Sequence, residues 1–467
     1  MFLAILMVLN GVFLAVVVAF TLDSVKEQEW RAARVGFGFM LCMVVLGGVI
    51  LLVPGLRWYI AIILGGLILL FVLCLIPGRP NPRAFKGSQG YVVQNVQRFD
   101  ERDIVFARNR SLPPGSAAYK RYYRMHPERE AKDAQRRAAG GPLGSIGSID
   151  GEHRPTIAML KGAFHLPHYL GEKENVEPPP EPSAFPIDPK EATERIKGFA
   201  RHLGADLVGV CRLDTRWAYS HRGEILFDNW DDWGTKIPLP LPFAIVIAVE
   251  MHADLVRGAP HTPSVVESGV KYAKGAYIST ILARFIAQLG YRAVAQHLRH
   301  YDLVLVPVAV DAGLGELGRF GYLITKEFGP RVRLAAVTTS LPLVPDKPVD
   351  LGAQEFCARC LKCADACPSD SIPRGEKLVF NGVEKWKLDE EGCFDYWGKV
   401  GTDCNICMAM CPYSRSNRSF HRLARWMVAK SPLARALLPA VDDVIYGRKW
   451  RSGKVPVWID YSKGRET

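Results

Sequence analysis

Three long apolar segments open the chain and separate its first 78 residues from the rest. Residues 1–21 contain no charged side chain, and two further apolar segments cover about 35–54 and 58–77. Each is long enough to cross the roughly 30 Å hydrocarbon core of a bilayer as a helix. One such segment could be a signal peptide or a buried core helix. Three in series, with no basic region before the first and no twin-arginine signal near the start, predict three transmembrane helices.

Basic residues around these segments predict the orientation of the helices. With three spans, the loop after the first segment and everything after the third lie on the same side, whereas the other side carries only Arg57 and the N-terminus. The basic residues of the first side are Lys26, Arg31, Arg34, Arg79, Arg83 and Lys86. Because basic loops are retained in the cytoplasm, we expect a multi-pass protein of the cell inner membrane with its large C-terminal portion in the cytoplasm.

Residues 79–189 form a polar and interrupted segment. Charged positions at helical spacing predict helix within 116–138, whereas residues 140–152 have the composition of a loop. Residues 177–189 are rich in proline and predict a stiff connector.

Residues 190–345 alternate between helical and strand patterns of apolar positions. The start of this region predicts a helix and then a short strand ending near residue 213, and residues 267–289 suit a long amphipathic helix. Apolar runs rich in β-branched residues predict three more buried strands, at 242–251, 302–313 and 331–340. Helices that alternate with buried strands indicate an α/β domain.

Eight of the eleven cysteines fall between residues 357 and 411. Residues 357–370, CARCLKCADACPSD, have the spacing Cys-x2-Cys-x2-Cys-x3-Cys-Pro that binds 4Fe–4S clusters in bacterial ferredoxins. A second run, CNICMAMCP, has Gly401 where its first cysteine is expected. Clustered cysteines in a chain of this length favour metal binding over disulfides.

The paired runs predict two four-cysteine ligand sets. In such pairs the fourth cysteine of each run binds the cluster of the other run, and Cys393 is the unassigned cysteine near the second run, so we expect it to replace the missing ligand. The sets are Cys357, Cys360, Cys363 and Cys411 for one cluster, and Cys367, Cys404, Cys407 and Cys393 for the other. The alternative, a pair of structural zinc sites, typically uses two separated CxxC pairs rather than four cysteines within eleven residues.

Charge and a glycine motif add two weaker indications. The chain carries 59 Lys and Arg against 47 Asp and Glu, a net charge of +12. This excess suits an anionic membrane surface or an acidic partner, and without a recognised nucleic-acid-binding motif no nucleic-acid partner is expected.

A GxGxxG motif at Gly313, Gly315 and Gly318 could be a nucleotide-binding loop, but Arg331 and Arg333 stand where the fingerprint requires an acidic residue. The glycines still let backbone approach a large ligand closely.

Several of these stretches together resemble the corrinoid-dependent reductive dehalogenases, over most of the chain after its apolar helices. Residues 98–128 are similar to the N-terminal block of that family, and 242–251, 310–325 and 328–339 resemble its cobalamin-binding core. The two cysteine runs, with the displaced Cys393, are similar to its cluster module. Many members instead carry a twin-arginine signal and use a separate membrane anchor.

The resemblance implies a fold and domain boundaries. We expect a nitroreductase-like α/β core joined to a ferredoxin-like module with two 4Fe–4S clusters, preceded by three transmembrane helices. The expected segments are 1–78 for the helices, 79–189 for the N-terminal block and linker, 190–345 for the cobalamin-binding core, 346–420 for the cluster module and 421–467 for a C-terminal extension.

The resemblance also implies a reaction. Electrons pass through the clusters to a cobalamin bound base-off, giving cob(I)alamin, and an organohalide exchanges its halogen for hydrogen. Tyr272 supplies the proton, and Arg333, or Arg331 as second choice, favours the phenolate that remains. Tyr277 is the nearest competing tyrosine, and His300 lies where the family often has a polar residue near the substrate. The expected corrinoid contacts are Gly313, Gly315, Gly318 and Arg319.

Two other functions fit parts of the pattern. An epoxyqueuosine reductase-like cobalamin enzyme would suit the basic charge but not the apolar helices. A corrinoid-free membrane iron–sulfur electron carrier would leave residues 190–345 without a purpose. The expected partners are an organohalide, membrane lipid and an electron donor, which could be a ferredoxin, a flavin reductase or quinol.

Overall fold

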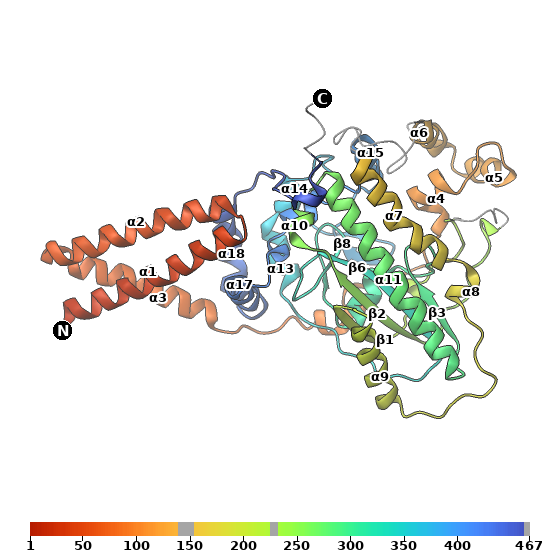
Figure 1. Cartoon of the computed structure of the whole chain (residues 1–467), viewed down its shortest axis with the longest axis horizontal. Coiled ribbons are helices and arrows are strands. Elements are labelled where there is room, and N and C mark those ends of the chain that lie inside the picture. The colour runs from red at the N-terminus through yellow and green to blue at the C-terminus, as the bar shows by residue number, and fades with distance from the viewer. Residues whose placement is uncertain (139–153, 225–231, 462–467) are drawn as a thin grey trace. The chain divides into compact units, whose positions relative to one another are not determined.

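The computed structural model describes residues 1–138, 154–224 and 232–461 (Figure 1). The chain divides into two compact units, and segments from both halves of the sequence contribute to each. The helical unit comprises residues 1–80, 351–360 and 416–449. The sheet unit comprises residues 81–350, 361–415 and 450–467.

Three long helices at the N-terminus confirm the expected apolar helices. They are α1 (Phe2–Lys26), α2 (Trp30–Leu52) and α3 (Arg57–Leu75). All three are long and apolar enough to cross a membrane. Helix α2 begins several residues before the apolar segment, because the helical backbone continues through the charged positions Arg31 and Arg34.

Three shorter helices complete the helical unit: α13 (Ala353–Cys360), α17 (Ser419–Lys430) and α18 (Pro432–Tyr446). Helix α18 packs against α2, α3 and α17, and α13 packs on α17 and α18 (Figure 1). Ser431 caps α18 by accepting a hydrogen bond from the backbone N–H of Ala434, and Pro432 occupies the first helical position, where a missing N–H costs nothing.

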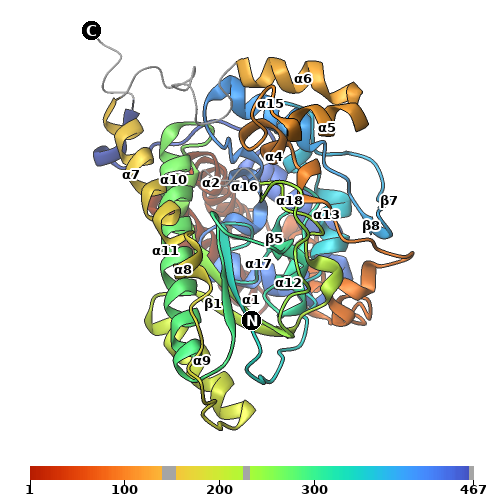
Figure 2. The ribbon, with the colours of Figure 1, turned by 90° about the vertical axis from the view of Figure 1, so that its right-hand side faces the viewer.

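A four-stranded antiparallel sheet with the order β1-β2-β6-β3 is the centre of the sheet unit. The strands are β1 (Leu207–Arg212), β2 (Phe243–Glu250), β3 (Ala293–Gln296) and β6 (Val332–Thr339). Ile245 and Ile247 of β2 pack in the core formed with α9 (Pro189–His202) and α11 (Thr262–Gln288). Ala244 and Val246 pack in the core formed with α12 (Leu305–Asp311) on the other face (Figure 2). Because helices cover both faces of the sheet, the strands consist of continuous apolar residues rather than alternating apolar and polar residues.

Most elements expected in this unit are confirmed, namely the helix and strand before residue 213, the long helix, and the strands at 242–251 and 331–340. The strand expected at 302–313 is wrong, since α12 occupies most of that stretch. Short apolar runs do not distinguish a buried strand from a buried helix, and Pro307 is tolerated in the first turn of α12 because its absent N–H would have no helical partner.

The remaining segments of the sheet unit are mostly short helices and strand pairs, with α7 the longest helix among them. Residues 116–138 are largely helical as expected, and the proline-rich connector is irregular up to Asp188. The loop expected at 140–152 lies outside the described residues. The other helices are α4 (Val105–Arg110), α5 (Ala117–Met125), α6 (Pro127–Ala138), α7 (Arg154–Leu170), α8 (Lys173–Val176), α10 (Ala253–Val256), α14 (Lys362–Asp365), α15 (Glu390–Val400) and α16 (Ile406–Met410). The other strands pair as β4 (Glu316–Leu317) with β5 (Leu323–Ile324), and β7 (Leu378–Phe380) with β8 (Val383–Lys385).

Candidate active site

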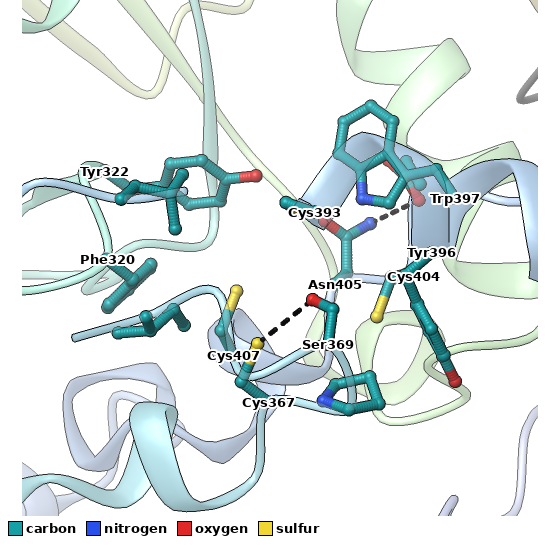
Figure 3. Close-up of a pocket in the computed structure, with 14 residues that line it drawn as sticks. Phe320, Tyr322, Cys367, Ser369, Cys393, Tyr396, Trp397, Cys404, Asn405 and Cys407 are labelled. Carbon is teal, nitrogen blue, oxygen red and sulfur yellow. Dashed lines mark hydrogen bonds between the residues drawn. The ribbon is translucent and has the colours of Figure 1, made fainter. Parts of the chain in front are cut away.

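Four cysteines of the sheet unit line one pocket (Figure 3). Cys367 follows α14, Cys393 lies on α15, Cys404 precedes α16 and Cys407 lies on α16. These are the four residues of the second expected ligand set, and they include the displaced Cys393. Aromatic side chains complete much of the wall: Phe320, Tyr322, Tyr396 and Trp397. The structure therefore brings this expected set together around one space, and their binding of a cluster stays a prediction.

The backbone around these cysteines explains the missing first cysteine of the second run. Gly401 ends α15 in the left-handed region, with φ of 74°, a conformation that glycine adopts readily. Asp389 begins the same helix, because its side chain accepts a hydrogen bond from the N–H of Gly392. The run thus has a helix-ending glycine where a ferredoxin has a cysteine, and α15 supplies Cys393 two turns earlier.

The environment of the pocket favours thiols over free thiolates. Burial raises the pKa of Cys393 to about 11 and that of Cys404 to about 12, and burial together with the neighbouring cysteines also raises the pKa of Cys407. Such groups lose their protons when a cationic metal centre binds the sulfur atoms. Within the described ranges no three Cys, His, Asp or Glu side chains are close enough to hold a single metal ion.

The other expected ligand set is divided between the two units. Cys357 and Cys360 lie on α13 in the helical unit. Cys363 lies on α14, and Cys411 follows α16, in the sheet unit.

A second cavity of about 640 Å³ borders the cysteine pocket and shares Tyr322, Leu388, Cys393 and Trp397 with it. Its volume lies within the roughly 300–1,000 Å³ of typical small-molecule and cofactor sites. Most of its lining is apolar, with many aromatic side chains: Tyr91, Phe99, Phe106, Trp217, Tyr219, Phe380, Trp386 and Phe394. A large flat ligand with an apolar body would fit this lining and would lie beside the cysteine pocket.

Tyr272 and Arg333 lie next to one another in the sheet unit. The guanidinium carbon of Arg333, on β6, lies 5.1 Å from the centre of the Tyr272 ring, on α11. Tyr272 is half-buried, whereas Arg333 is buried with 8% of its surface exposed. Although burial by itself lowers the pKa of an arginine, the neighbouring Tyr272 and Asp403 raise that of Arg333, so its charge is secure. Within the described chain, neither side chain belongs to the lining of the 640 Å³ cavity.

A polar network joins Arg333 to the cysteine pocket. Its Nη2 donates to Ser268 Oγ at 2.6 Å and to Asp403 Oδ2 at 3.0 Å. The Asn405 amide donates to Asp403 Oδ1 at 2.7 Å, and both Asp403 and Asn405 line the cysteine pocket. Sequence reasoning missed these partners, although Asp403 and Asn405 flank Cys404 and that position was a usable signal.

Arg331 and Tyr277 have other surroundings. Arg331 forms an ion pair with Glu250 at 2.9 Å and donates from Nε to the Ser414 carbonyl at 2.7 Å. Tyr277 is 43% exposed. The geometry therefore favours Arg333 over Arg331 as the cation beside Tyr272, and Tyr272 over Tyr277 as the enclosed tyrosine.

Tyr322 is a further residue that sequence reasoning missed. It lines both the cysteine pocket and the 640 Å³ cavity. Burial raises the pKa of its hydroxyl far above the ordinary value, Cys407 raises it further, and Arg333 partly opposes that shift. Tyr322 therefore stays protonated between the two spaces and within electrostatic range of Arg333 and Tyr272.

The expected glycine contacts pack against the chain itself. A side chain at Gly315 would lie 2.1 Å from the Ile324 carbonyl oxygen, and one at Gly313, whose φ is 73°, would lie 2.4 Å from that of Lys347. Gly318 packs against Ile324. Among the described lining residues of the cavity, this loop contributes Leu317, Gly321 and Tyr322 rather than the three motif glycines.

Arg319 is buried, whereas His300 is partly exposed. Arg319 donates to the carbonyls of Pro373 and Gly375 and lies over the ring of Trp386, a cavity residue. His300 is only partly buried, with Nε2 at 3.8 Å from Asp302, and burial lowers its pKa. Contacts of either residue with a cofactor or substrate stay predictions.

Comparisons with known proteins agree with this arrangement. The 4Fe-4S dicluster domain family matches residues 356–414. The tetrachloroethene reductive dehalogenase of Sulfurospirillum multivorans is 34% identical over 293 residues, a match that covers 56% of this chain and 58% of that protein. The chain is therefore similar to reductive dehalogenases over little more than half of its length. A solved reductive dehalogenase, described as suggesting a mechanism for B12-dependent dehalogenation, is 27% identical with a TM-score of 0.60, over 81% of this chain and 50% of that one.

The match to reductive dehalogenases is partial in length. The chain spans little more than half of the curated relative it matches and about half of the solved structure. A shorter match, 34% identical over 125 residues, relates it to the epoxyqueuosine reductase of Lactococcus garvieae and covers 26% of this chain.

Proposed function

We propose that this chain is a membrane-anchored reductive dehalogenase that replaces a halogen of an organohalide by hydrogen. The observation that carries the proposal is the 640 Å³ aromatic cavity that shares Tyr322, Cys393 and Trp397 with the four-cysteine pocket. A corrinoid in the cavity and a 4Fe–4S cluster on Cys367, Cys393, Cys404 and Cys407 would then lie side by side. The second cluster would be held by Cys357, Cys360, Cys363 and Cys411.

The core and the cofactor state follow from the same proposal. We infer that residues 190–345 form a nitroreductase-like core that holds the corrinoid base-off, without a histidine ligand from the protein. Leu317, Gly321 and Tyr322, which end the glycine loop on the cavity wall, support this placement, and Arg319 supports it by bracing Trp386.

Removal of one halogen consumes two electrons and one proton and releases halide. When bound, the corrinoid supplies the two electrons to the carbon–halogen bond after reduction through the clusters. In the proposal Tyr272 gives the proton from its hydroxyl. An ordinary tyrosine has a pKa near 10 and is a weak acid at neutral pH, so the adjacent guanidinium of Arg333 is needed to favour the phenolate. Asp403 and Ser268 hold Arg333 in place.

Cofactor content and halide release test the proposal together. We expect the full chain, purified without oxygen, to contain one cobalt and about eight irons, as two 4Fe–4S clusters require. With titanium(III) citrate as reductant it should release chloride from tetrachloroethene or from another chlorinated or brominated probe in a panel. A preparation with full iron content, no cobalt and no halide release from any probe would show an electron carrier instead.

The short match to an epoxyqueuosine reductase supports a second candidate function. The same preparation, supplied with tRNA that contains epoxyqueuosine, distinguishes the two functions. Conversion of the tRNA without halide release would favour the second candidate. The three apolar helices favour the first, because a tRNA substrate requires no membrane anchor.

A further inference from the structure

Helix α18 presents an apolar stripe to its surroundings and an arginine to its own unit. The exposed positions recur at intervals of three and four residues and therefore share one face: Ala436, Leu437, Ala440, Val441 and Val444. Val441 and Val444 are 45% and 58% exposed. Arg435 points the opposite way, and is buried with Nε donating to the Val428 carbonyl at 2.8 Å and Nη2 donating to that of Ala429 at 3.1 Å. A helix on the surface of a water-soluble domain buries its apolar face and exposes its charged residues. Helix α18 does the reverse, since its apolar face is exposed and its arginine is buried.

Helix α17 adds a mixed face of apolar and basic residues. Leu423 and Trp426 are 39% and 45% exposed, and Arg422 and Lys430 are exposed on the same side of the helix. Tryptophan next to basic residues, on a helix that lies in the plane of a membrane surface, is the composition of an interfacial helix.

Both helices are fixed to one end of the α1–α3 bundle. In the last turn of α1, Asp23 forms an ion pair with Arg418 at 2.9 Å, and just beyond the helix Glu27 lies 3.0 Å from His421. At the start of α2, Arg31 donates to the Val444 carbonyl at 3.4 Å.

Beyond α3, the N–H of Gly78 donates to the Lys430 carbonyl at 2.8 Å. The end of α1, the start of α2 and the end of α3 lie at the same end of a three-helix bundle (Figure 1). Helices α17 and α18 are therefore held at the level where a transmembrane bundle leaves the hydrocarbon core.

We propose that α17 and α18 lie in the lipid–water interface, with the stripe of α18 and the Leu423–Trp426 face of α17 in contact with phospholipid. The occupant is the surface of the membrane that α1–α3 cross, and Arg422 and Lys430 select anionic headgroups in it. The inference rests on the proposed membrane anchoring and adds that the C-terminal helices are part of the membrane-binding surface.

Site-specific photocrosslinking of the full chain tests this contact. Benzoylphenylalanine is placed at Leu437 or Val441, in protein reconstituted in liposomes of phosphatidylethanolamine and phosphatidylglycerol. Ile62 of α3, 70% exposed, is the positive control, and Leu239 of the sheet unit, 66% exposed, is the matched negative control. We expect phospholipid adducts by mass spectrometry at Leu437, Val441 and Ile62, and none at Leu239.

The controls separate the failure of the inference from the failure of the anchoring. Adducts at Ile62, together with no adduct or a crosslink to a second copy of the chain at Leu437, would overturn the inference and leave the anchoring intact. Absence of lipid at Ile62 would overturn the anchoring and the inference with it.

A separate experiment tests whether Arg422 and Lys430 select anionic lipid. With benzoylphenylalanine at Leu423, Arg422→Glu and Lys430→Glu should each lower the ratio of phosphatidylglycerol to phosphatidylethanolamine adducts by at least roughly five-fold at low salt, because each removes one positive charge and adds a negative one. Lys120→Glu, an exposed charge reversal in the sheet unit, is the matched control and should leave the ratio unchanged. An unchanged ratio in the two α17 variants would contradict the selection of anionic lipid.

Discussion

Tyr272 lies against a guanidinium that is itself held by hydrogen bonds to Ser268 and Asp403. Tyr272→Phe removes one hydroxyl and little volume, so we expect folding, cobalt and iron content to be preserved. Halide release should fall by about 10²-fold or more, the usual effect of losing a general acid. Steady-state rates on protein with matched cofactor content check this result.

The matched control for this variant is Tyr277→Phe, which removes the same hydroxyl from an exposed residue one and a half turns along α11. It should keep nearly full activity. Full activity of Tyr272→Phe, with loss of activity in Tyr277→Phe, would reverse the assignment.

Cys393→Ala should damage one cluster and spare the other. Cys393 lies in the pocket of Cys367, Cys404 and Cys407, so the variant should lose the EPR signal of that cluster and part of its iron. Cys211→Ala is the control, because Cys211 is also buried but lies in the core of the sheet, outside the pocket. Two unchanged EPR signals in Cys393→Ala would contradict the ligand assignment.

For single residues, the sequence predicted which side chains belong to the site better than it predicted which side chains contact them. The spacing of Cys393 and the cysteine runs was enough to group four thiols that the structure places around one pocket. Asp403 and Ser268 could not be predicted as partners of Arg333, because they lie 70 and 65 residues away in the chain. The motif glycines suggested a ligand, whereas the structure shows that their close neighbours include backbone of Lys347 and Ile324.

Helix α15, which carries Cys393, is held by ion pairs from α6 in which the arginine is buried and the carboxylates are partly exposed. Arg136 of α6 is 7% exposed and bonds Asp395 at 2.5 Å and Glu391 at 3.2 Å. Because Asp395 and Glu391 are 39% and 31% exposed, the loss of Arg136 should cost less than the roughly 3–5 kcal/mol typical of removing one partner of a fully buried pair. Arg136→Gln should still lower the midpoint of thermal unfolding and speed the loss of iron from the cluster near Cys393 under a chelator.

The matched control for Arg136 lies on the same helix. Lys132 approaches Glu391 and Asp395 at 3.5 and 3.4 Å but is 52% exposed, and exposed ion pairs contribute little. Lys132→Gln should behave almost as wild type. Equal iron loss in the two variants would contradict a specific role of the buried arginine.

The effect of Arg136 also depends on pH. Its hydrogen bond lowers the pKa of Asp395 below the ordinary value near 4. A lowered carboxylate pKa stabilises the fold above that ordinary value, and the stabilisation is lost as the pH falls through the lowered pKa. The difference in unfolding midpoint between wild type and Arg136→Gln should be largest near neutral pH and shrink on acidification below about 4.

At the scale of elements, periodicity predicted long helices and continuous strands correctly. It failed at α12, because an apolar run of seven helical residues, Leu305–Asp311, has too few turns to show a helical period. The contacts of α6 with α15 were also beyond prediction, because they join segments about 260 residues apart through charged side chains that look like a solvated face in the sequence.

The basic residues at the ends of the apolar helices predict the topology of the whole chain. A green fluorescent protein fused after residue 90 should fluoresce, and an alkaline phosphatase fused there should be inactive, if the sheet unit lies in the cytoplasm. The reverse pattern would place it on the other side. Fusions in the short turn between α2 and α3 (Val53–Leu56) serve as the control and should show the reverse pattern.

The packing of α13 against α18 has a consequence for how the molecule is supplied with reducing power. Cys357 and Cys360 lie on α13, and Arg435 of α18 approaches Glu355 of α13 at 3.8 Å. If these cysteines hold a cluster, two of its four expected ligands belong to the unit that carries the three apolar helices. If those helices cross a membrane, an electron carrier that diffuses within the lipid would reach this cluster by a two-dimensional search. The rate of cluster reduction would then follow the number of carriers per membrane area rather than the carrier concentration in the cell fluid.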